Sequence, residues 1–101
     1  MDEMIEIEHA GIILKEEFME PFSVSTYRLM QGTGIDKMTL HKIIHGKRGI
    51  SAKTGLKLSR FFGLNDNYWV NLQADYDIRK AKVQISEELK QIIPLQALKS
   101  V

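Results

Sequence analysis

The chain has 101 residues, of which 44% are hydrophobic and 27% charged. This is the composition of one small globular domain, and it excludes wholesale disorder or a fibrous chain. The absence of cysteine excludes disulfides, cysteine-ligated metals and thiol catalysis. No apolar run approaches the roughly 18 residues of a membrane span, and the acidic start has no signal-peptide pattern. We therefore expect a cytoplasmic protein without membrane contact.

The formal net charge of +1 hides a strong segregation of charge along the chain. Residues 1–21 hold seven acids and one lysine, a net −6, whereas residues 36–60 hold seven cations and one acid, a net +6. Residues 22–35 add +1, and residues 61–101 balance five acids against five cations. A local excess of lysine is usually solvated surface and favours a polyanion only modestly, so the position of these charges on the fold must decide.

The spacing of apolar residues predicts three short helices in the first half of the chain and no convincing strand. The first covers His9–Glu20 and ends at Pro21, whose ring does not continue a helix. The second follows a cap at Ser23 or Ser25 and stops in the glycine-containing stretch 32–34. The third covers about 37–45, between an N-cap at Asp36 and a glycine at position 46. Its apolar residues Leu40, Ile43 and Ile44 are expected to be buried.

Two further helices are predicted in the second half. Ser51 caps the fourth, which Gly63 closes, and its internal Gly55 indicates a close helix crossing, because glycine inside a helix costs about 1 kcal/mol relative to alanine. Asn65 and Asp66 are expected to cap the fifth. Its aromatic residues and those of the fourth helix are interpreted as core and dimer contacts: Phe61, Phe62, Tyr68 and Trp69. Beyond Lys82 the pattern weakens, leaving a tail that is strand, short helix or partner-bound segment.

The second and third helices, joined by a tight turn, have the layout of a helix-turn-helix. Such a motif rests one helix across the DNA backbone and inserts the next into the major groove, which is about 12 Å wide. The third helix has a polar outer face, and Lys47 and Arg48 follow it where a loop would meet phosphates. The N-terminus of the next helix, at Ser51, offers backbone N–H donors to the same target.

Several separate stretches, in this order, resemble one known family. They are GIILKEEFMEP at 11–21, YRL at 27–29, HGKRGIS at 45–51, RFFG at 60–63 and YWVNLQA at 68–74. Together they are similar to the HigA/VapI-type antitoxins, a branch of the phage-repressor-like helix-turn-helix proteins. The resemblance covers about His9 to Ala81. It implies an all-α, five-helix DNA-binding domain at 9–81. Residues 82–101 are then a C-terminal extension, which contacts either a second copy or a partner.

The resemblance also implies a function. Members of this family bind operator DNA as homodimers, repress their own operon and neutralise a HigB-type toxin that cleaves messenger RNA. The DNA-binding residues it implies lie on the third helix and the loop after it, together with two on the second helix: Tyr27, Arg28, Lys37, Met38, Thr39, His41, Lys42, Lys47 and Arg48. Met38 and His41 stand where the family commonly has small polar residues, so base preference is not transferred. Met30 and Gly32 replace the usual alanines, and Thr33 replaces an apolar residue.

Some of these residues have a plainer interpretation. Lysines on helix surfaces are usually solvated, and Tyr27 either contacts the DNA backbone or seals the core. His41 and His45 have the spacing of a metal pair, but no third ligand is evident, so no metal and no cofactor are predicted. No paired carboxylates, activated serine or phosphate-binding glycine loop stands out, so the chain is not expected to be an enzyme.

The acidic N-terminal region provides a second surface. Glu16, Glu17 and Glu20 are candidates for binding a basic toxin. Two alternatives remain open: a stand-alone helix-turn-helix repressor with no toxin partner, and a protein-interaction module in which the helix-turn-helix is only structural.

Overall fold

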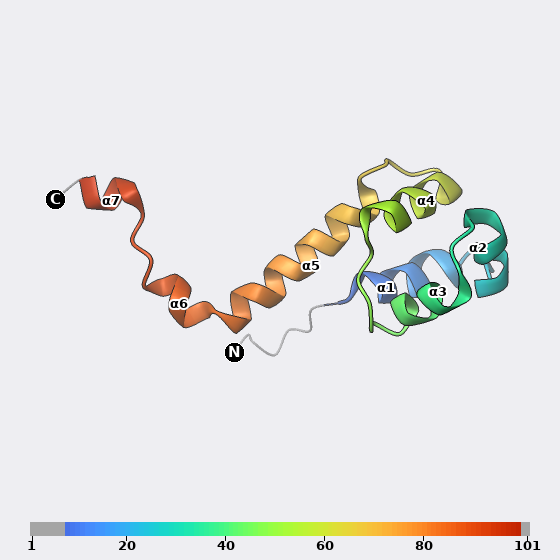
Figure 1. Ribbon diagram of the computed structural model, residues 1–101, viewed down its shortest axis with the longest axis horizontal. Helices are drawn as coiled ribbons and strands as arrows, with labels where there is room; N and C mark the ends of the chain where they lie inside the picture. The colour runs from blue at the N-terminus through green and yellow to red at the C-terminus, as the bar shows by residue number, and fades with distance from the viewer. Residues whose placement is uncertain (1–7, 100–101) are drawn as a thin grey trace.

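The computed structural model describes residues 8–99, and this part of the chain is all-α, as the sequence predicts (Figure 1). Asp2, Glu3 and Glu6, three of the acids counted in the acidic N-terminal region, lie outside the described residues, as do the last two residues of the predicted extension. No helix within 8–99 is both long enough and apolar enough to cross a membrane.

The first predicted helix is present but is not uniform. It begins as α1 (Ala10–Ile13) and continues as the π-helix η2 (Leu14–Met19), in which the amide of Glu20 reaches back five residues to the carbonyl of Lys15. This wider winding puts both Leu14 and Met19 in the core. Gly11 lies so close to the end of α3 that an added methyl group would overlap the carbonyl oxygen of Ile43.

Two helices and a three-residue turn form the helix-turn-helix: α2 (Thr26–Thr33) and α3 (Lys37–Ile44). Ser25, not Ser23, caps α2, its hydroxyl accepting a hydrogen bond from the Arg28 amide at 3.0 Å. Ser23 instead turns the chain with a positive φ of 56°. Gly34 ends α2 in the left-handed conformation, which glycine adopts at no steric cost, and Asp36 then caps α3 as predicted.

The next two helices are α4 (Ala52–Phe62) and α5 (Tyr68–Gln84). Ser51 caps α4 and Gly63 closes it, as predicted. A methyl group on Gly55 would lie 3.2 Å from Val70 and 3.3 Å from Trp69, which confirms the close helix crossing.

The predicted cap of α5 is wrong. The helix begins after Asn67, which makes no side-chain cap hydrogen bond. Asn65 forms a turn with its side chain on the Asn67 amide, and Asp66 pairs with Arg60 at 3.0 Å, so both predicted cap side chains are engaged elsewhere.

The core lies between α1, η2, α2, α3, α4 and the first half of α5. Its fully buried members are Leu14, Leu29, Leu40, Ile43, Leu58 and Trp69. Phe18 from η2 closes it, with ring centroids 5.0 Å from Trp69 and 5.2 Å from Phe62. Trp69 is thus a core residue as predicted.

The unusual residues of α2 have a local explanation. A side chain at Gly32 would overlap the ring of Phe61, so only glycine allows the ring to pack at this position. Thr33 bonds the Leu29 carbonyl at 2.7 Å and accepts from the Ile35 amide at 3.1 Å, which uses its polarity to close the helix. Met30 turns partly outward and is half-buried against the core.

The second half of α5 leaves the compact part and continues into α6 (Ser86–Lys90) and α7 (Leu95–Lys99), two short helices (Figure 1). Of the structures left open for the tail, short helix is the one observed. This arm (residues 78–99) stretches the molecule to 60 × 28 × 22 Å. Many of its apolar side chains are exposed: Ile78, Val83, Ile85, Leu89, Ile92, Ile93, Leu95 and Leu98.

Candidate nucleic-acid interface

The polar face of α3 is exposed while its apolar face is fixed in the core. Leu40 and Ile43 are fully buried and Ile44 nearly so. On the opposite face, Met38 is 63% exposed, and the side chains of Lys37, His41 and Lys42 also reach solvent. The helix is therefore held rigidly from behind and presents cations, an imidazole and a thioether outward.

The start of α3 is organised by three side chains. Asp36 accepts hydrogen bonds from the backbone amide of Thr39 at 2.8 Å and from its hydroxyl at 3.1 Å. These two bonds hold the pKa of the Asp36 carboxyl below its usual range, and the bond from the backbone amide has the larger effect. The nearby charge of Arg48 lowers the pKa further. Arg48 also reaches the Thr39 hydroxyl at 3.5 Å. The hydroxyl of the half-buried Thr39 is thus already engaged by other side chains of the protein.

The loop 45–50 carries the predicted phosphate contacts and is held at both ends. At its start, the amides of Gly46 and Lys47 bond the carbonyls of Ile43 and Lys42 at 3.0 and 2.8 Å, the pattern that closes a helix around a left-handed glycine. At its end, the amide of Ile50 donates to the side-chain oxygen of Gln73 on α5 at 2.8 Å. Between these two points Lys47 and Arg48 are exposed.

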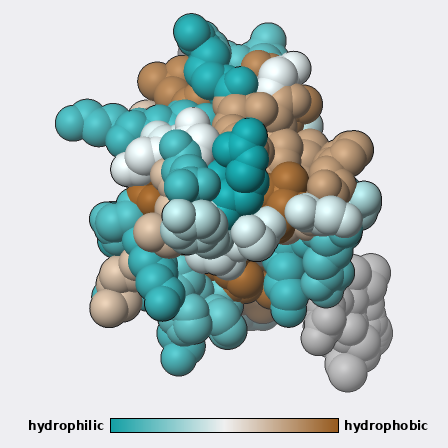
Figure 2. All heavy atoms as spheres, turned by 90° about the vertical axis from the view of Figure 1, so that its right-hand side faces the viewer, coloured by the Kyte–Doolittle hydropathy of each residue, from teal (hydrophilic) through white to brown (hydrophobic). Residues whose placement is uncertain are grey.

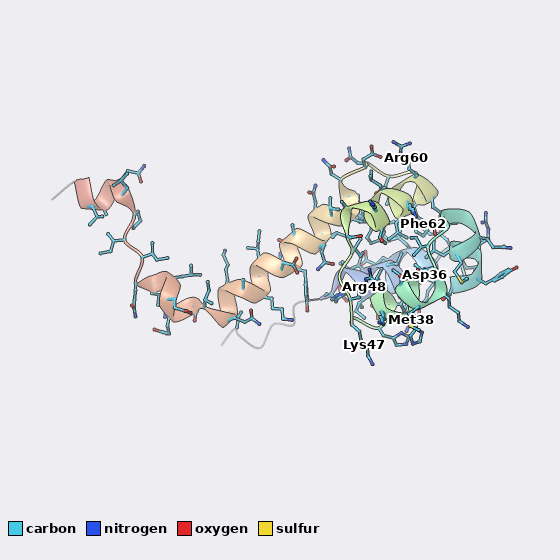
Figure 3. The ribbon with its side chains drawn as sticks, viewed as in Figure 1. Asp36, Met38, Lys47, Arg48, Arg60 and Phe62 are labelled. Carbon is cyan, nitrogen blue, oxygen red and sulfur yellow. The ribbon has the colours of Figure 1, made fainter. Side chains whose placement is uncertain are left out.

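Figure 3 shows how the labelled cations are distributed. Lys47 and Met38 project from the same edge of the fold, with Arg48 and Asp36 just inside it, whereas Arg60 lies at the opposite edge. Arg60 is paired with Asp66 there. The basic segment 36–60 is therefore not one surface, because Arg60 on α4 lies at the edge opposite Lys47.

His41 of α3 and His45, the residue that caps the C-terminus of this helix, stack on each other with ring centroids 4.1 Å apart. His45 also bonds the His41 carbonyl through Nδ1 at 2.8 Å, which engages one of its ring nitrogens. Among residues 8–99 no cluster of three or more histidine or acidic side chains could hold a metal ion. The pair contributes polar surface beside Lys42.

The two candidates on α2 differ in how freely they can reach a partner. Tyr27 is 65% exposed and accepts a hydrogen bond from Gln31 at 2.9 Å, so the interpretation that it seals the core is wrong. Arg28 lies over the ring of Phe61 at 5.2 Å, where the ring face attracts the guanidinium. From the side of α2, hydrophilic side chains cover most of this end of the molecule, with a smaller hydrophobic group among them (Figure 2).

The acidic candidates occupy other elements. Glu16 and Glu17 lie on η2 and Glu20 in the turn after it, and all three are exposed. None belongs to α2, α3 or the loop 45–50, so the acidic and basic candidates sit on separate elements.

Gln73 is a site residue that sequence reasoning missed. It lies in the 68–74 stretch that carries part of the family resemblance, but its hydrogen bond joins residues 23 positions apart. A polar residue on the inner side of an otherwise amphipathic helix was the only available signal.

Comparisons with known proteins agree with this geometry. No protein-family model matches the chain. The chain is 36% identical over 87 residues to virulence-associated protein I of Dichelobacter nodosus, covering 86% of this chain and 80% of the relative. The antitoxin HigA of Pseudomonas aeruginosa, solved with the higBA promoter, superimposes with a TM-score of 0.82 at 31% identity, covering 89% of this chain and 99% of that one. The antitoxin GraA, solved in complex with its operator, gives 0.80 at 30% identity, covering 90% and 93%.

These similar proteins are described as antitoxins and virulence-associated proteins, which agrees with the prediction that the chain is not an enzyme. The identity extends over most of both chains, and the shared fold includes the helix-turn-helix whose residues first indicated the resemblance. The chain therefore belongs to the HigA/VapI family of helix-turn-helix antitoxins.

Proposed function

We propose that this chain is an antitoxin of a type II toxin–antitoxin system that acts in the cytoplasm. It binds operator DNA as a homodimer to repress its own operon, and it neutralises a HigB-type toxin that cleaves messenger RNA. The observation that carries the DNA-binding half is the exposed polar face of α3, fixed from behind by Leu40 and Ile43. Similar proteins solved with promoter or operator DNA support it.

On the DNA, α3 enters the major groove. Lys37 and Met38 lie in its first turn and His41 and Lys42 in its second, so the helix offers hydrogen-bond donors to base edges and a thioether to thymine methyl groups. Thr39 contributes through its methyl group, since its hydroxyl is bonded within the protein. Lys47 and Arg48 neutralise phosphates beside the groove, and Tyr27 and Arg28 approach the backbone from α2.

The homodimer is supported by the arm. Residues 9–81 form the DNA-binding domain in this proposal, and the extension from 82 contributes to the contact between copies. Leu89 is 40% exposed, Ile92 67% and Ile93 58%, although each is a strongly apolar side chain. A folded chain rarely leaves such a run exposed to water, and a second copy covers it while supplying the second reading helix that a two-part operator needs.

The dimer is tested by light scattering on the pair Leu89→Asp and Ile92→Asp. We expect the doubly substituted chain to be monomeric with an unchanged helical circular dichroism spectrum. Gln91→Asp, an exposed polar position in the same segment, is the control and stays dimeric. A dimer that survives both substitutions would remove the arm from the interface.

The toxin contact is assigned to Glu16, Glu17 and Glu20. Their charge complements a basic, RNA-cutting partner, and their exposure on η2 and the following turn leaves them free while α3 is on DNA. Reversing all three to lysine should weaken toxin capture in a pull-down and leave operator affinity unchanged. Equal loss of both activities would indicate misfolding and contradict the assignment.

The proposal as a whole is tested by a mobility-shift titration on the DNA upstream of the protein's own gene. The titration is repeated with the product of the neighbouring gene. We expect sequence-specific binding in both cases and an altered complex when the toxin is present. Binding without any effect of the neighbour would leave a stand-alone repressor, and no binding would contradict the DNA-binding half.

A further inference from the structure

We infer that Gln73 is a positioning residue for DNA binding, because it fixes the loop that carries Lys47 and Arg48. The inference rests on the proposed function of that loop. It adds that the position of the loop depends on a side chain of α5. Gln73 itself touches loop backbone and Asp77, and it acts on DNA only through the two cations.

The geometry of Gln73 suits this role at both ends of its amide. Its oxygen accepts from the Ile50 amide at 2.8 Å, and its nitrogen donates to the Asp77 carboxylate at 3.0 Å. Asp77 lies one helical turn further along α5, so it orients the amide with the oxygen toward the loop. Gly49 leaves space for the Gln73 amide, because a methyl group on Gly49 would lie 3.0 Å from the carbon and nitrogen of that amide.

The loop is thereby fastened to a rigid part of the molecule. Trp69, one turn before Gln73, is completely buried, so α5 cannot shift here without disturbing the core. The far end of the loop is closed onto α3 by Gly46 and Lys47. Without the Gln73 bond, the segment between those points loses its hydrogen bond to α5 and is held by its closure onto α3 and by the buried side chain of Ile50.

A polar hollow of about 230 Å³ lies where the loop meets α5. Lys47, Arg48 and Gln73 line it together with Asp77 and Lys80. Because α5 continues without a break into the arm, Gln73 ties the phosphate-contacting loop to the helix that, in the proposed dimer, sets the separation of the two reading heads.

The test is a double-mutant cycle on operator affinity measured by fluorescence anisotropy with the full-length chain. Gln73→Met keeps the shape of the side chain and removes its acceptor. We expect operator affinity to fall roughly three- to tenfold, the effect of losing one hydrogen bond, with a shallower salt dependence. In a background of Lys47→Ala and Arg48→Ala, the same substitution should change affinity by less than about 1.5-fold, because the contacts that Gln73 positions are already absent.

Three further variants separate positioning from general stability. Asn71→Leu makes the corresponding amide-to-apolar change at an exposed position of α5 outside the arm and should leave affinity unchanged. Gly49→Ala pushes a methyl group against the Gln73 amide from the loop side and should reproduce the effect of Gln73→Met. The double substitution Gln73→Glu and Asp77→Asn reverses the direction of the hydrogen bond between residues 73 and 77 at constant net charge and keeps an acceptor for the Ile50 amide. It should have the operator affinity of the parent chain.

The outcomes distinguish this inference from the proposed function. Equal losses from Gln73→Met in both backgrounds, or no loss in the parent chain, would overturn the positioning role while leaving DNA binding by the loop intact. If the two alanine substitutions themselves change neither affinity nor salt dependence, the loop makes no phosphate contact and both assignments fall. Should Gln73→Met unfold the chain, Gly49→Ala carries the same cycle.

Discussion

Lys47 and Arg48 should account for a defined part of the salt dependence of operator binding. Removing both by alanine substitution deletes two cations from each copy, hence four phosphate contacts from a bound dimer. Since each neutralised phosphate contributes about 0.9 to the slope of log affinity against log salt, the slope should fall by about 3.6. Between 50 and 200 mM salt, the parent chain should therefore lose about 150-fold more affinity than the variant.

The chain contains a matched control for this experiment. Lys57 and Arg60 lie close together on α4, and Arg60 is at the edge of the fold opposite Lys47 (Figure 3). Replacing both with alanine removes the same charge from the other side of the molecule, and we expect the slope to change by less than about one. Titrations at five salt concentrations measure both slopes. Equal flattening by the two variants would mean that net charge, and not the loop, determines binding, and would refute the reasoning.

Three further predictions concern the fold that holds the interface. Gly11→Ala should lower the free energy of unfolding by about 2 kcal/mol or more, roughly 8–16 °C in melting temperature, because the methyl group would overlap the Ile43 carbonyl; a melt within 2–3 °C of the parent would contradict this. Ser59→Ala should be neutral or stabilising by up to about 1 kcal/mol in denaturant titrations, because within residues 8–99 its buried hydroxyl has no hydrogen-bond partner, and a clear loss would mean that one exists. Burial lowers the pKa of His9, so the stability it contributes should be complete above about pH 6.5 and should decrease as the pH drops toward the lowered pKa. The variant His9→Asn keeps a cap acceptor for the Gly11 amide and should not show this decrease. Identical pH profiles of stability for the parent and the variant would contradict the assignment.

The sequence predicted the elements that local rules govern. The cap at Asp36 and the spacing of apolar residues identified α3. The same spacing predicted that Leu40 is buried and that the polar face of the helix points outward. The close crossing at Gly55 was also predictable, since an internal glycine in a helix needs a packing reason.

The remaining features depend on contacts between distant parts of the chain. Arg28 is held by Phe61 from another helix, and Gln73 bonds the Ile50 amide from 23 residues away; neither contact leaves a periodic trace in the sequence. The π-helical winding after α1 follows from fitting both Leu14 and Met19 into one core, which the order of residues alone does not reveal. The prediction that Asp66 helps to cap α5 was wrong because its side chain pairs with Arg60 instead.

Operator binding by two copies of α3 is most directly tested by footprinting on the DNA upstream of the gene, followed by anisotropy titrations with altered spacing. We expect two protected half-sites about 34 Å apart, centre to centre. We also expect a large loss of affinity when about five base pairs are inserted between them, since the second reading helix then faces the wrong side of the duplex. Affinity that is indifferent to the insertion, or equal on scrambled DNA, would contradict this mode of binding.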